Sequence, residues 1–444
     1  MPADGFAPLF QQQGVAPDAV VVRGARVLDP VAGVDQVLDV RVDGGVIAEL
    51  GERLAAIGHR EVDGTGLTLA PAFVDPHVHL RVPGREDEET VASGSAAAAA
   101  GGFCAILAMP NTDPVVDSAA VLGSLIEQAL ADAVIPVGFM ASITKGLAGE
   151  ELSEMAELAE VGAAAFTDDG RPVVSAGMMR RALQYAAVTG RCIALHEEEP
   201  TLSGKGQMHE GRVSAELGFA GWPSIGESVM IARDLALCAY EGRTVHIQHM
   251  SAKESVDELR RWQALGVAAT GEASPHHLVL TDEAVRTLDS NFKMNPPLRA
   301  EDDRQALIAG LKDGTISCIA TDHAPHARHE KEAPFEEAPF GVTGLETAFA
   351  AVYTHLVLPG ILPLELVLKA MCQGPAEALG LEVPRIAVGA PANLVLLDLD
   401  ANWTVTEAGF RSKSANSWLL GATLQGRPLL TIARGRVAHD LTAL

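Results

Sequence analysis

Eight short apolar runs, separated by stretches of helical character, constrain the fold of this chain more than any other feature of its sequence. A parallel sheet that is covered on both faces needs near-continuous apolar strands, and eight such strands are the number in a (β/α)8 barrel. The sequence therefore predicts a parallel barrel in its central part. The runs are Phe73 to Asp75, Phe103 to Met109, Val134 to Met140, Ala163 to Phe166, Cys192 to Leu195, Thr244 to Ile247, Val267 to Thr270 and Ile316 to Ala320.

Helical stretches alternate with these runs, as expected for repeated βα units. We therefore predict an α/β fold with a (β/α)8 TIM barrel over residues 71–385. The predicted helices are the alanine-rich stretch ending at Ala100 and the segments Ser118 to Asp132, Glu150 to Glu160, Ser175 to Thr189, Ile225 to Tyr240, Ala252 to Leu265 and Asp302 to Lys312.

Both ends of the chain alternate apolar and polar residues with the period of a half-buried strand. Near the N-terminus this pattern covers residues 20–29 and 37–48, with Asp43-Gly44 as the expected turn. It returns at residues 392–398, 403–405 and 428–437. Because chain termini often lie close together, we predict one small discontinuous β-sandwich domain, built from residues 1–70 and 386–444.

Charge and cysteine content limit the class of protein. The formal net charge of −25 argues against nucleic acid or an anionic membrane as partner. The five cysteines are scattered and form no CxxC motif, so we expect buried free thiols in a reducing compartment.

The first residues do not have the pattern of a signal peptide, and no window approaches roughly eighteen uninterrupted apolar residues. We expect a cytoplasmic protein.

Two histidines, His77 and His79, follow the first apolar run. Side chains at i and i+2 of a strand point to the same face, so both imidazoles can reach one metal ion. Arg81 is on that face too if the extended geometry continues. An isolated HxH pair is more often two polar residues without a metal.

Further metal-ligand residue types follow the other predicted strands, at the end of a barrel where functional groups project. Imidazole with carboxylate suits Zn²⁺ or a neighbouring divalent ion. The sequence therefore predicts a metal site at the carboxyl ends of the strands. The residues at these ends are Asp168, Asp169, His196, His246, His249, His276, His277, Asp322, His323 and His326.

Several long motifs resemble those of the dihydroorotase family, of the bacterial class I type, within the amidohydrolase superfamily. The resemblance runs over nearly the whole chain from about residue 20. It implies reversible cyclisation of N-carbamoyl-L-aspartate to L-dihydroorotate in pyrimidine biosynthesis. The motifs are DPHVHLRVPG at 75–84, AMPNTDPV at 108–115, AFTDDG at 165–170, HIQHMS at 246–251, SPHHL at 274–278, FKMNPPLR at 292–299, ATDHAPH at 320–326 and APFGVTGLET at 338–347.

The resemblance implies a ligand set for one or two Zn²⁺ ions, with two expected. His77, His79 and Asp322 would hold the more buried ion, His196 and His249 the second, and Asp169 would bridge them. Many superfamily members carry a carbamylated lysine where this chain has Thr167, so no carbamyl-lysine bridge is expected. Lys145 is a weak substitute for that lysine.

The resemblance also implies the roles of the substrate-side residues. A metal-activated hydroxide would attack the ring carbonyl, with Asp322 as general acid/base. Arg81 can bind a carboxylate bidentately, with Asn111 and His326 as companions. The remaining residues expected at the substrate are His79, Asn295, Phe340 and Gly341.

Other polar residues are assigned no chemistry. At least two of Glu197, Glu198 and Glu199 are expected to be solvated or to cap a helix, and either His276 or His277 could support a ligand. The charged segment 327–337 is expected to be a loop over the site and a candidate mobile lid. Lone histidines are expected at the surface: His59, His209, His329, His355 and His439.

Two alternatives to a dihydroorotase stay open. A hydantoinase or allantoinase would share the barrel and the HxH pair, but would favour a lysine at position 167. A non-catalytic scaffold for aspartate transcarbamoylase would lack metal ligands, whereas here all are present. The expected partners are the small-molecule substrate, aspartate transcarbamoylase and a second copy of the chain in a homodimer.

Overall fold

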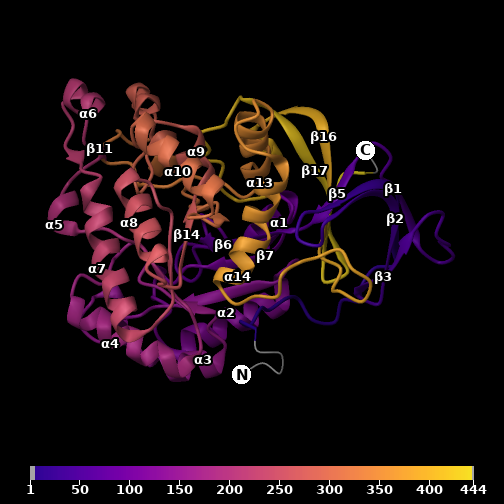
Figure 1. The fold of residues 1–444 in the computed structure, drawn as a ribbon, viewed down its shortest axis with the longest axis horizontal. Coiled ribbons are helices and arrows are strands. Elements are labelled where there is room, and N and C mark those ends of the chain that lie inside the picture. Colours follow the sequence, from indigo (N-terminus) through magenta and orange to yellow (C-terminus); the bar gives the residue numbers. More distant parts are fainter. Residues whose placement is uncertain (1–5, 443–444) are drawn as a thin grey trace.

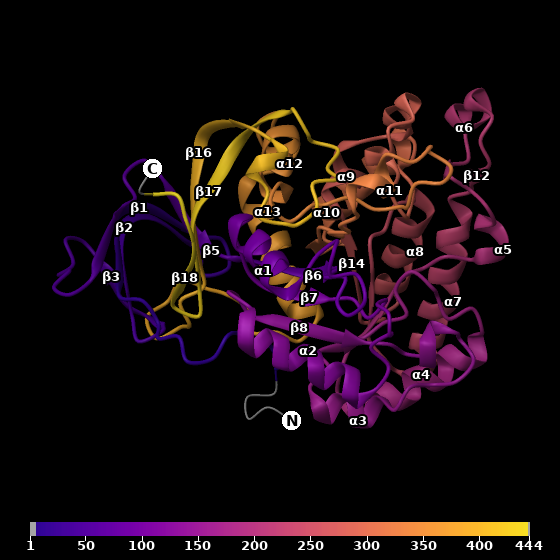
Figure 2. The same cartoon turned by 180° about the vertical axis from the view of Figure 1, so that it is seen from behind.

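The computed structural model describes residues 6–442, which form a barrel and a separate sheet. Figure 1 shows the barrel and its helices on one side and the sheet on the other, where the yellow C-terminal strands lie beside the indigo N-terminal ones. Figure 2 shows the same two parts from behind. The predicted fold class, a TIM barrel with a β domain made from both chain ends, is confirmed.

All eight predicted barrel strands are present and pair in parallel in sequence order. Each is buried because helices cover the outside and side chains fill the inside. Val78 forms a parallel bridge with His323, and the His79 amide donates to the His323 carbonyl at 2.8 Å, which brings the last strand to the first. The strands are β6 (Phe73–Val78), β7 (Phe103–Ala108), β8 (Val137–Ala141), β9 (Ala165–Phe166), β10 (Ile193–Leu195), β13 (Val245–Ile247), β14 (Ala269–Ala273) and β15 (Cys318–Ile319).

The seven predicted helices also form, each between two barrel strands. Three further helices, α12 to α14, follow β15 and were not predicted. The helix α12 continues into a single π-helical stretch, Tyr353–Val357. The main helices are α1 (Val91–Ala100), α2 (Ala119–Asp132), α3 (Met155–Val161), α4 (Ala176–Thr189), α7 (Ile225–Glu241), α8 (Lys253–Ala264), α10 (Glu301–Asp313), α12 (Ala348–Val352), α13 (Leu364–Met371) and α14 (Gln373–Ala378).

Shorter elements lie in the loops at the carboxyl ends of the strands. The long connection after β10 holds two short helices and a two-stranded ribbon, and the connections after β14 and β15 each hold a one-turn helix. These elements are α5 (Pro200–Ser203), β11 (Met208–His209), α6 (Arg212–Leu217), β12 (Gly221–Trp222), α9 (Pro275–Val279) and α11 (Arg328–Lys331).

The second sheet joins both ends of the chain, because β5 of the N-terminal segment pairs antiparallel with β16 of the C-terminal one. It has its own hydrophobic core, distinct from that of the barrel. The expected turn at Asp43-Gly44 joins β2 and β3. The strands are β1 (Val20–Asp29), β2 (Val34–Asp43), β3 (Val46–Gly51), β4 (Arg60–Asp63), β5 (Thr68–Pro71), β16 (Leu394–Thr404), β17 (Thr423–Ala433) and β18 (Arg436–Asp440).

The two strands predicted at 392–398 and 403–405 are one strand, β16, with a shift of register between Asp398 and Asn402. The Asp398 carboxylate accepts from the amides of Asp400 and Ala401 at 3.0 and 2.9 Å, and this local turn bulges the strand without ending it. The domain boundaries 1–70, 71–385 and 386–444 stay a prediction.

Candidate active site

Metal-ligand side chains from five strand ends meet at the carboxyl-terminal end of the barrel. His77 lies in β6, with His79 just after it, and the others follow β9, β10, β13 and β15. All six side chains are buried, between 0 and 7% exposed. We call this group the metal cluster: His77, His79, Asp169, His196, His249 and Asp322.

Asp169 lies at the centre of the metal cluster. Its Oδ1 is 3.5 Å from His77 Nε2, from His196 Nδ1 and from His249 Nε2, and its Oδ2 is 3.6 Å from His79 Nε2. Burial alone would raise the pKa of this carboxyl, but His77 and the neighbouring imidazoles hold its pKa well below the usual range. Asp169 is therefore an ionised carboxylate shared by four imidazoles.

Asp322 closes the other side of the cluster. Its Oδ1 lies 3.2 Å from His79 Nε2 and 3.5 Å from His77 Nε2. Within the cluster, ligand atoms within 4.8 Å of one another form two groups of three, His77 with His79 and Asp322, and His77 with Asp169 and His249. The six side chains can thus surround two neighbouring cation positions, with Asp169 touching both. A third such group of three among residues 6–442 lies outside the cluster and consists of Glu88, His326 and Glu330.

The donor set fits a divalent metal. His77 Nε2 is buried and has no hydrogen-bond partner among the described residues, although it points at two carboxylates. His196 Nδ1 and His249 Nε2 face each other at 2.8 Å beside Asp169. Imidazole nitrogens and carboxylates converging in a buried site are the ligands that Zn²⁺ and its neighbours prefer.

Thr167 and Lys145 take no part in the cluster. Thr167 donates its hydroxyl to Gln248 at 2.9 Å. The Lys145 ammonium pairs with Glu151 at the surface. Asp169 is therefore the acidic group at the centre, and no lysine lies there.

Glu272, in β14, supports the cluster and was missed in the sequence. Its Oε1 accepts from His77 Nδ1 at 2.7 Å and from the His249 amide at 3.0 Å, and its Oε2 lies 2.9 Å from His246 Nε2. The side chain is fully buried. Such a carboxylate orients a ligating histidine and raises its basicity. Glu272 lies two residues beyond the predicted run Val267 to Thr270, so its place near a strand end was the available signal.

The backbone at the site is unusual. Seven described residues other than glycine have positive φ, and three of them are Arg81 (59°), His249 (28°) and Asp322 (48°). This left-handed conformation is disfavoured for side chains with a Cβ, and it concentrates at functional sites. Asp75 anchors the neighbouring turns, because its carboxylate accepts from the amides of His77 and Thr321, both at 3.1 Å.

One cavity of about 160 Å³ joins the metal cluster to the expected substrate residues. It is lined by His79, Asp169, His196, His249 and Asp322 on one side. On the other side are the residues that we call the substrate subsite: Arg81, Asn111, Asn295, His326, Phe340 and Gly341. Every predicted site residue except His77 lines this cavity, and His77 contacts two of the lining residues, Asp169 and Asp322.

Asn111 and Asn295 have different surroundings. Asn111 Oδ1 lies 2.9 Å from His79 Nδ1, and its Nδ2 donates to Asp169 Oδ2 at 3.1 Å, so this side chain is tied to the metal cluster. The Oδ1 of Asn295 is buried without a hydrogen-bond partner among residues 6–442. It is free to accept from a ligand in the cavity.

Several polar residues lie elsewhere than expected. Of the three glutamates after β10, only Glu199 caps a helix; Glu198 contacts His196 Nε2 at 3.2 Å, and Glu197 is buried. His209 is buried, and burial lowers its pKa to about 4. These expectations were wrong because Glu197 lies beside charged residues of α7, and His209 lies against the buried Arg299 at 3.4 Å.

His276 and His277 are both buried near the site. His277 bonds to Ser274 Oγ at 2.7 Å and to the Pro296 carbonyl at 2.9 Å. Burial, followed by the charge of His277, lowers the pKa of His276 well below its usual value. Neither contacts a member of the metal cluster by a hydrogen bond, so the cluster's support comes from Glu272 and Asn111.

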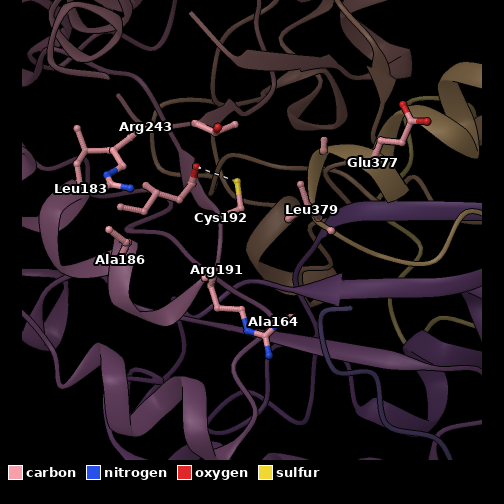
Figure 3. A pocket seen from close by; sticks show the side chains of 14 residues that line it. Ala164, Leu183, Ala186, Arg191, Cys192, Arg243, Glu377 and Leu379 are labelled. Carbon is pink, nitrogen blue, oxygen red and sulfur yellow. Dashed lines mark hydrogen bonds between the residues drawn. The ribbon is translucent and has the colours of Figure 1, made fainter. Parts of the chain in front are cut away.

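A second cavity, of about 340 Å³, lies at the opposite end of the barrel, beside residues that precede β9, β10 and β13. Figure 3 shows Arg191 and Arg243 extending in different directions around Cys192, whose thiol contacts the Ile193 carbonyl. The two cations do not converge, and the cavity has no metal-ligand cluster.

Comparisons with known proteins agree with this site. A family model described as dihydro-orotase-like matches residues 66–255. A protein of Pelotomaculum thermopropionicum named dihydroorotase is 46% identical over 421 residues, covering 94% of this chain and 98% of the relative. One of Trichlorobacter lovleyi with the same name is 44% identical over 422 residues, with 95% and 99% coverage.

Solved structures show the same fold. The L-hydantoinase (dihydropyrimidinase) from Arthrobacter aurescens has a TM-score of 0.85 and 26% identity, with 96% of each chain covered. The dihydropyrimidinase from Brevibacillus agri NCHU1002 has a TM-score of 0.82 at 21% identity, covering 96% of this chain and 95% of the other, and shows the fold alone.

The sequence relatives are closer than these structural ones, and both groups share the barrel that carries the metal cluster. No helix within residues 6–442 is long and apolar enough to cross a membrane. On the relatives at 44 and 46% identity, this chain belongs to the dihydroorotase family, a family of metal-dependent cyclic amidohydrolases.

Proposed function

We propose that this protein catalyses the reversible cyclisation of N-carbamoyl-L-aspartate to L-dihydroorotate, the dihydroorotase reaction of pyrimidine biosynthesis. The observation that carries the proposal is a single cavity that places Arg81, a group for a substrate carboxylate, beside the metal cluster. The relatives named dihydroorotase support the same assignment. The proposed location is the cytoplasm.

Zn²⁺ is the proposed metal, with two ions in each subunit. His77, His79 and Asp322 would hold one ion, His196 and His249 the other, and Asp169 both. When bound, such ions supply hydroxide at neutral pH and polarise a carbonyl. The unpaired Nε2 of His77 and the facing nitrogens of His196 and His249 support this arrangement.

Asp322 is the proposed general acid/base. Its Oδ1 faces His77 and His79, whereas no hydrogen bond within residues 6–442 uses its Oδ2. In hydrolysis, Oδ2 takes the proton of the attacking hydroxide and returns it to the leaving ring nitrogen. In ring closure, the same oxygen removes the proton from the attacking nitrogen and returns it to one oxygen of the substrate carboxylate, which leaves as hydroxide. Burial alone would raise the pKa of Asp322, but the neighbouring histidines lower this pKa below its usual value. The carboxyl group therefore starts ionised.

The substrate subsite binds and orients the substrate. Arg81, Asn111 and His326 are proposed to hold the α-carboxylate, with His79 at the boundary between substrate and metal. Asn295 Oδ1 would accept from a ring N–H. The backbone of Phe340 and Gly341 would face the same ring. This binding fixes the reacting carbonyl beside the metal cluster and excludes water around it.

A substrate panel tests the proposal. Purified protein loaded with Zn²⁺ is offered L-dihydroorotate, hydantoin, allantoin and dihydrouracil, and ring opening is followed by the loss of ultraviolet absorbance or by chromatography. We expect rapid turnover of dihydroorotate alone. Turnover of hydantoin, allantoin or dihydrouracil but not dihydroorotate would assign a hydantoinase-type or allantoinase activity. No turnover of any ring would favour a scaffold role.

Two macromolecular partners belong to the proposal, aspartate transcarbamoylase and a second copy of this chain. The first would supply carbamoyl aspartate directly to the cavity. Light scattering gives the mass of the protein alone and of its mixture with a transcarbamoylase. A monomer mass for the protein alone would exclude the homodimer, and an unchanged mass in the mixture would exclude the transcarbamoylase complex.

A further inference from the structure

We propose that Glu88 is a positioning residue, whose buried carboxylate holds Arg81 and His326 side by side so that both face the substrate carboxylate. Glu88 lies in the loop between β6 and α1, outside the cavity lining. The inference rests on the proposed function, because it concerns how the substrate subsite is held.

Glu88 touches both members of the pair. Its Oε2 lies 3.2 Å from Arg81 Nε, and its Oε1 lies 3.3 Å from His326 Nδ1. The Glu88 side chain is only 2% exposed, and that of Arg81 is 16% exposed. A single carboxylate thus spans a cation from the loop after β6 and an imidazole from the loop after β15.

The buried guanidinium needs this carboxylate. The Arg81 side chain is mostly buried, and Glu88 is the one carboxylate within residues 6–442 that lies within 4.0 Å of its guanidinium. A buried charge that loses its partner is left uncompensated, and its side chain then moves toward water or toward another carboxylate. Two carboxylates of the metal cluster, Asp169 and Asp322, line the same cavity as Arg81, and the guanidinium could turn toward them if Glu88 were lost.

The contacts of Arg81 leave one edge of the guanidinium for a ligand. Nε also donates to the Pro325 carbonyl at 2.9 Å, and Nη2 lies 3.2 Å from His326 Nε2. No hydrogen bond within residues 6–442 uses Nη1. Glu88 therefore holds the Nε side of Arg81 and leaves Nη1 to face the cavity.

Arg85 explains how the negative charge of Glu88 can lie close to a site that binds an anionic substrate. Its Nη2 lies 3.0 Å from Glu88 Oε1 and also 3.0 Å from Glu330 in α11. Arg85 thus neutralises the outer side of Glu88 and ties the loop after β6 to the segment 327–337. The opposite hypothesis is that Glu88 competes with substrate for Arg81, and it predicts tighter binding when the charge is removed.

The test compares Glu88→Gln with Glu86→Gln in the full-length, metal-loaded protein. Both changes remove one negative charge from the same loop, but Glu86 is exposed, and within residues 6–442 the only hydrogen bond of its side chain is from the Gly84 amide. We expect Glu88→Gln to raise the KM for dihydroorotate roughly tenfold, as for loss of one charge-assisted hydrogen bond, with kcat within about threefold of the wild type. Glu86→Gln should match the wild type.

A double-mutant cycle shows whether Glu88 acts through Arg81. The double variant Arg81→Lys/Glu88→Gln should have a KM close to that of Arg81→Lys alone. Each single change already disrupts the interaction between Glu88 and Arg81, so the second change adds little. Additive effects would contradict the proposal. So would an unchanged or lower KM in Glu88→Gln.

A second variant covers the case in which Glu88→Gln does not fold. Glu88→Asp keeps the negative charge, but its shorter side chain moves the carboxylate oxygens away from Arg81 and His326. A KM that is raised at least threefold supports the proposal, whereas a smaller change overturns it. A wild type that turns over no dihydroorotate would refute the proposed function itself, a result distinct from a failure at Glu88.

Discussion

The metal cluster and the substrate subsite line one cavity. The ends of barrel strands supply the residues of the metal cluster, whereas loops supply those of the substrate subsite. Glu272, inside β14, fixes the orientation of His77. The Phe340 and Gly341 backbone is held instead by Lys331, whose Nζ donates to the carbonyls of Pro339 and Gly341 at 2.9 and 3.0 Å. The comparison teaches that chemistry is placed on the rigid barrel and substrate recognition on loops that are fixed by buried charges.

The largest effect is expected inside the metal cluster. Asp322→Asn should lower kcat for dihydroorotate by a factor of about 10² to 10⁴, because an amide cannot carry the proton. Circular dichroism should be unchanged, and the exposed Asp302→Asn serves as control. A rate near that of the wild type would refute the role of Asp322 and weaken the division between chemistry and recognition.

The support of the cluster should show in metal affinity. Glu272→Gln removes the carboxylate that accepts from His77 and faces His246, and we expect zinc affinity to fall roughly 10- to 100-fold. Competition with a chromophoric chelator measures it, with the exposed Glu254→Gln as control. Unchanged affinity would mean that His77 needs no such support.

A change in the substrate subsite should affect binding and not chemistry. Arg81→Lys keeps the charge but loses the planar pair of donors, so the KM for dihydroorotate should rise about tenfold with kcat nearly unchanged. Steady-state kinetics measure both, and Arg181→Lys on the surface of α4 is the control. A fall in kcat with unchanged KM would break the comparison.

The smallest effect concerns the lysine that fixes the loop. Burial lowers the pKa of Lys331 to about 7, against 10.5 for an ordinary lysine. Between these values the unfolded chain binds more protons than the folded one, so Lys331 contributes stability that rises with pH, by at most about 1.4 kcal/mol for each unit.

Urea unfolding of the wild type and of Lys331→Met, compared from pH 7 to pH 9, measures this contribution. The difference should shift in favour of the wild type as pH rises, whereas Lys312→Met on the exposed side of α10 should show no such trend. A difference that is independent of pH would mean that Lys331 keeps its proton in the fold.

The residue pattern predicted the metal ligands at the strand ends, whereas the substrate-subsite residues were expected mainly from the family resemblance. His77, His79 and Asp322 lie at the ends of apolar runs, and the rule that functional groups follow barrel strands is enough to place them together. Glu88 and Lys331 carry no such signal, because a charged residue in a loop is usually solvated. Their burial depends on how loops distant in sequence pack, which periodicity does not record.

The same limit explains the helices after β15 and the single strand β16. The stretch after residue 340 contains a family motif, and that motif does not indicate the helices α12 to α14 that follow it. In β16, Asp398 and Asp400 resemble a turn, yet pairing with β17 carries the strand past them. Tertiary pairing overrides local turn chemistry in such places. The mobility of segment 327–337 stays a prediction.

The most direct test of the central claim is a titration of metal against activity. Protein freed of metal by a chelator is reloaded stepwise with Zn²⁺, and bound zinc and dihydroorotate turnover are measured at each step. We predict that turnover disappears without metal and reaches its maximum near two ions per chain, and that Asp169→Ala binds fewer ions and stays inactive. Turnover that survives complete removal of the metal, or full activity in Asp169→Ala, would contradict the account.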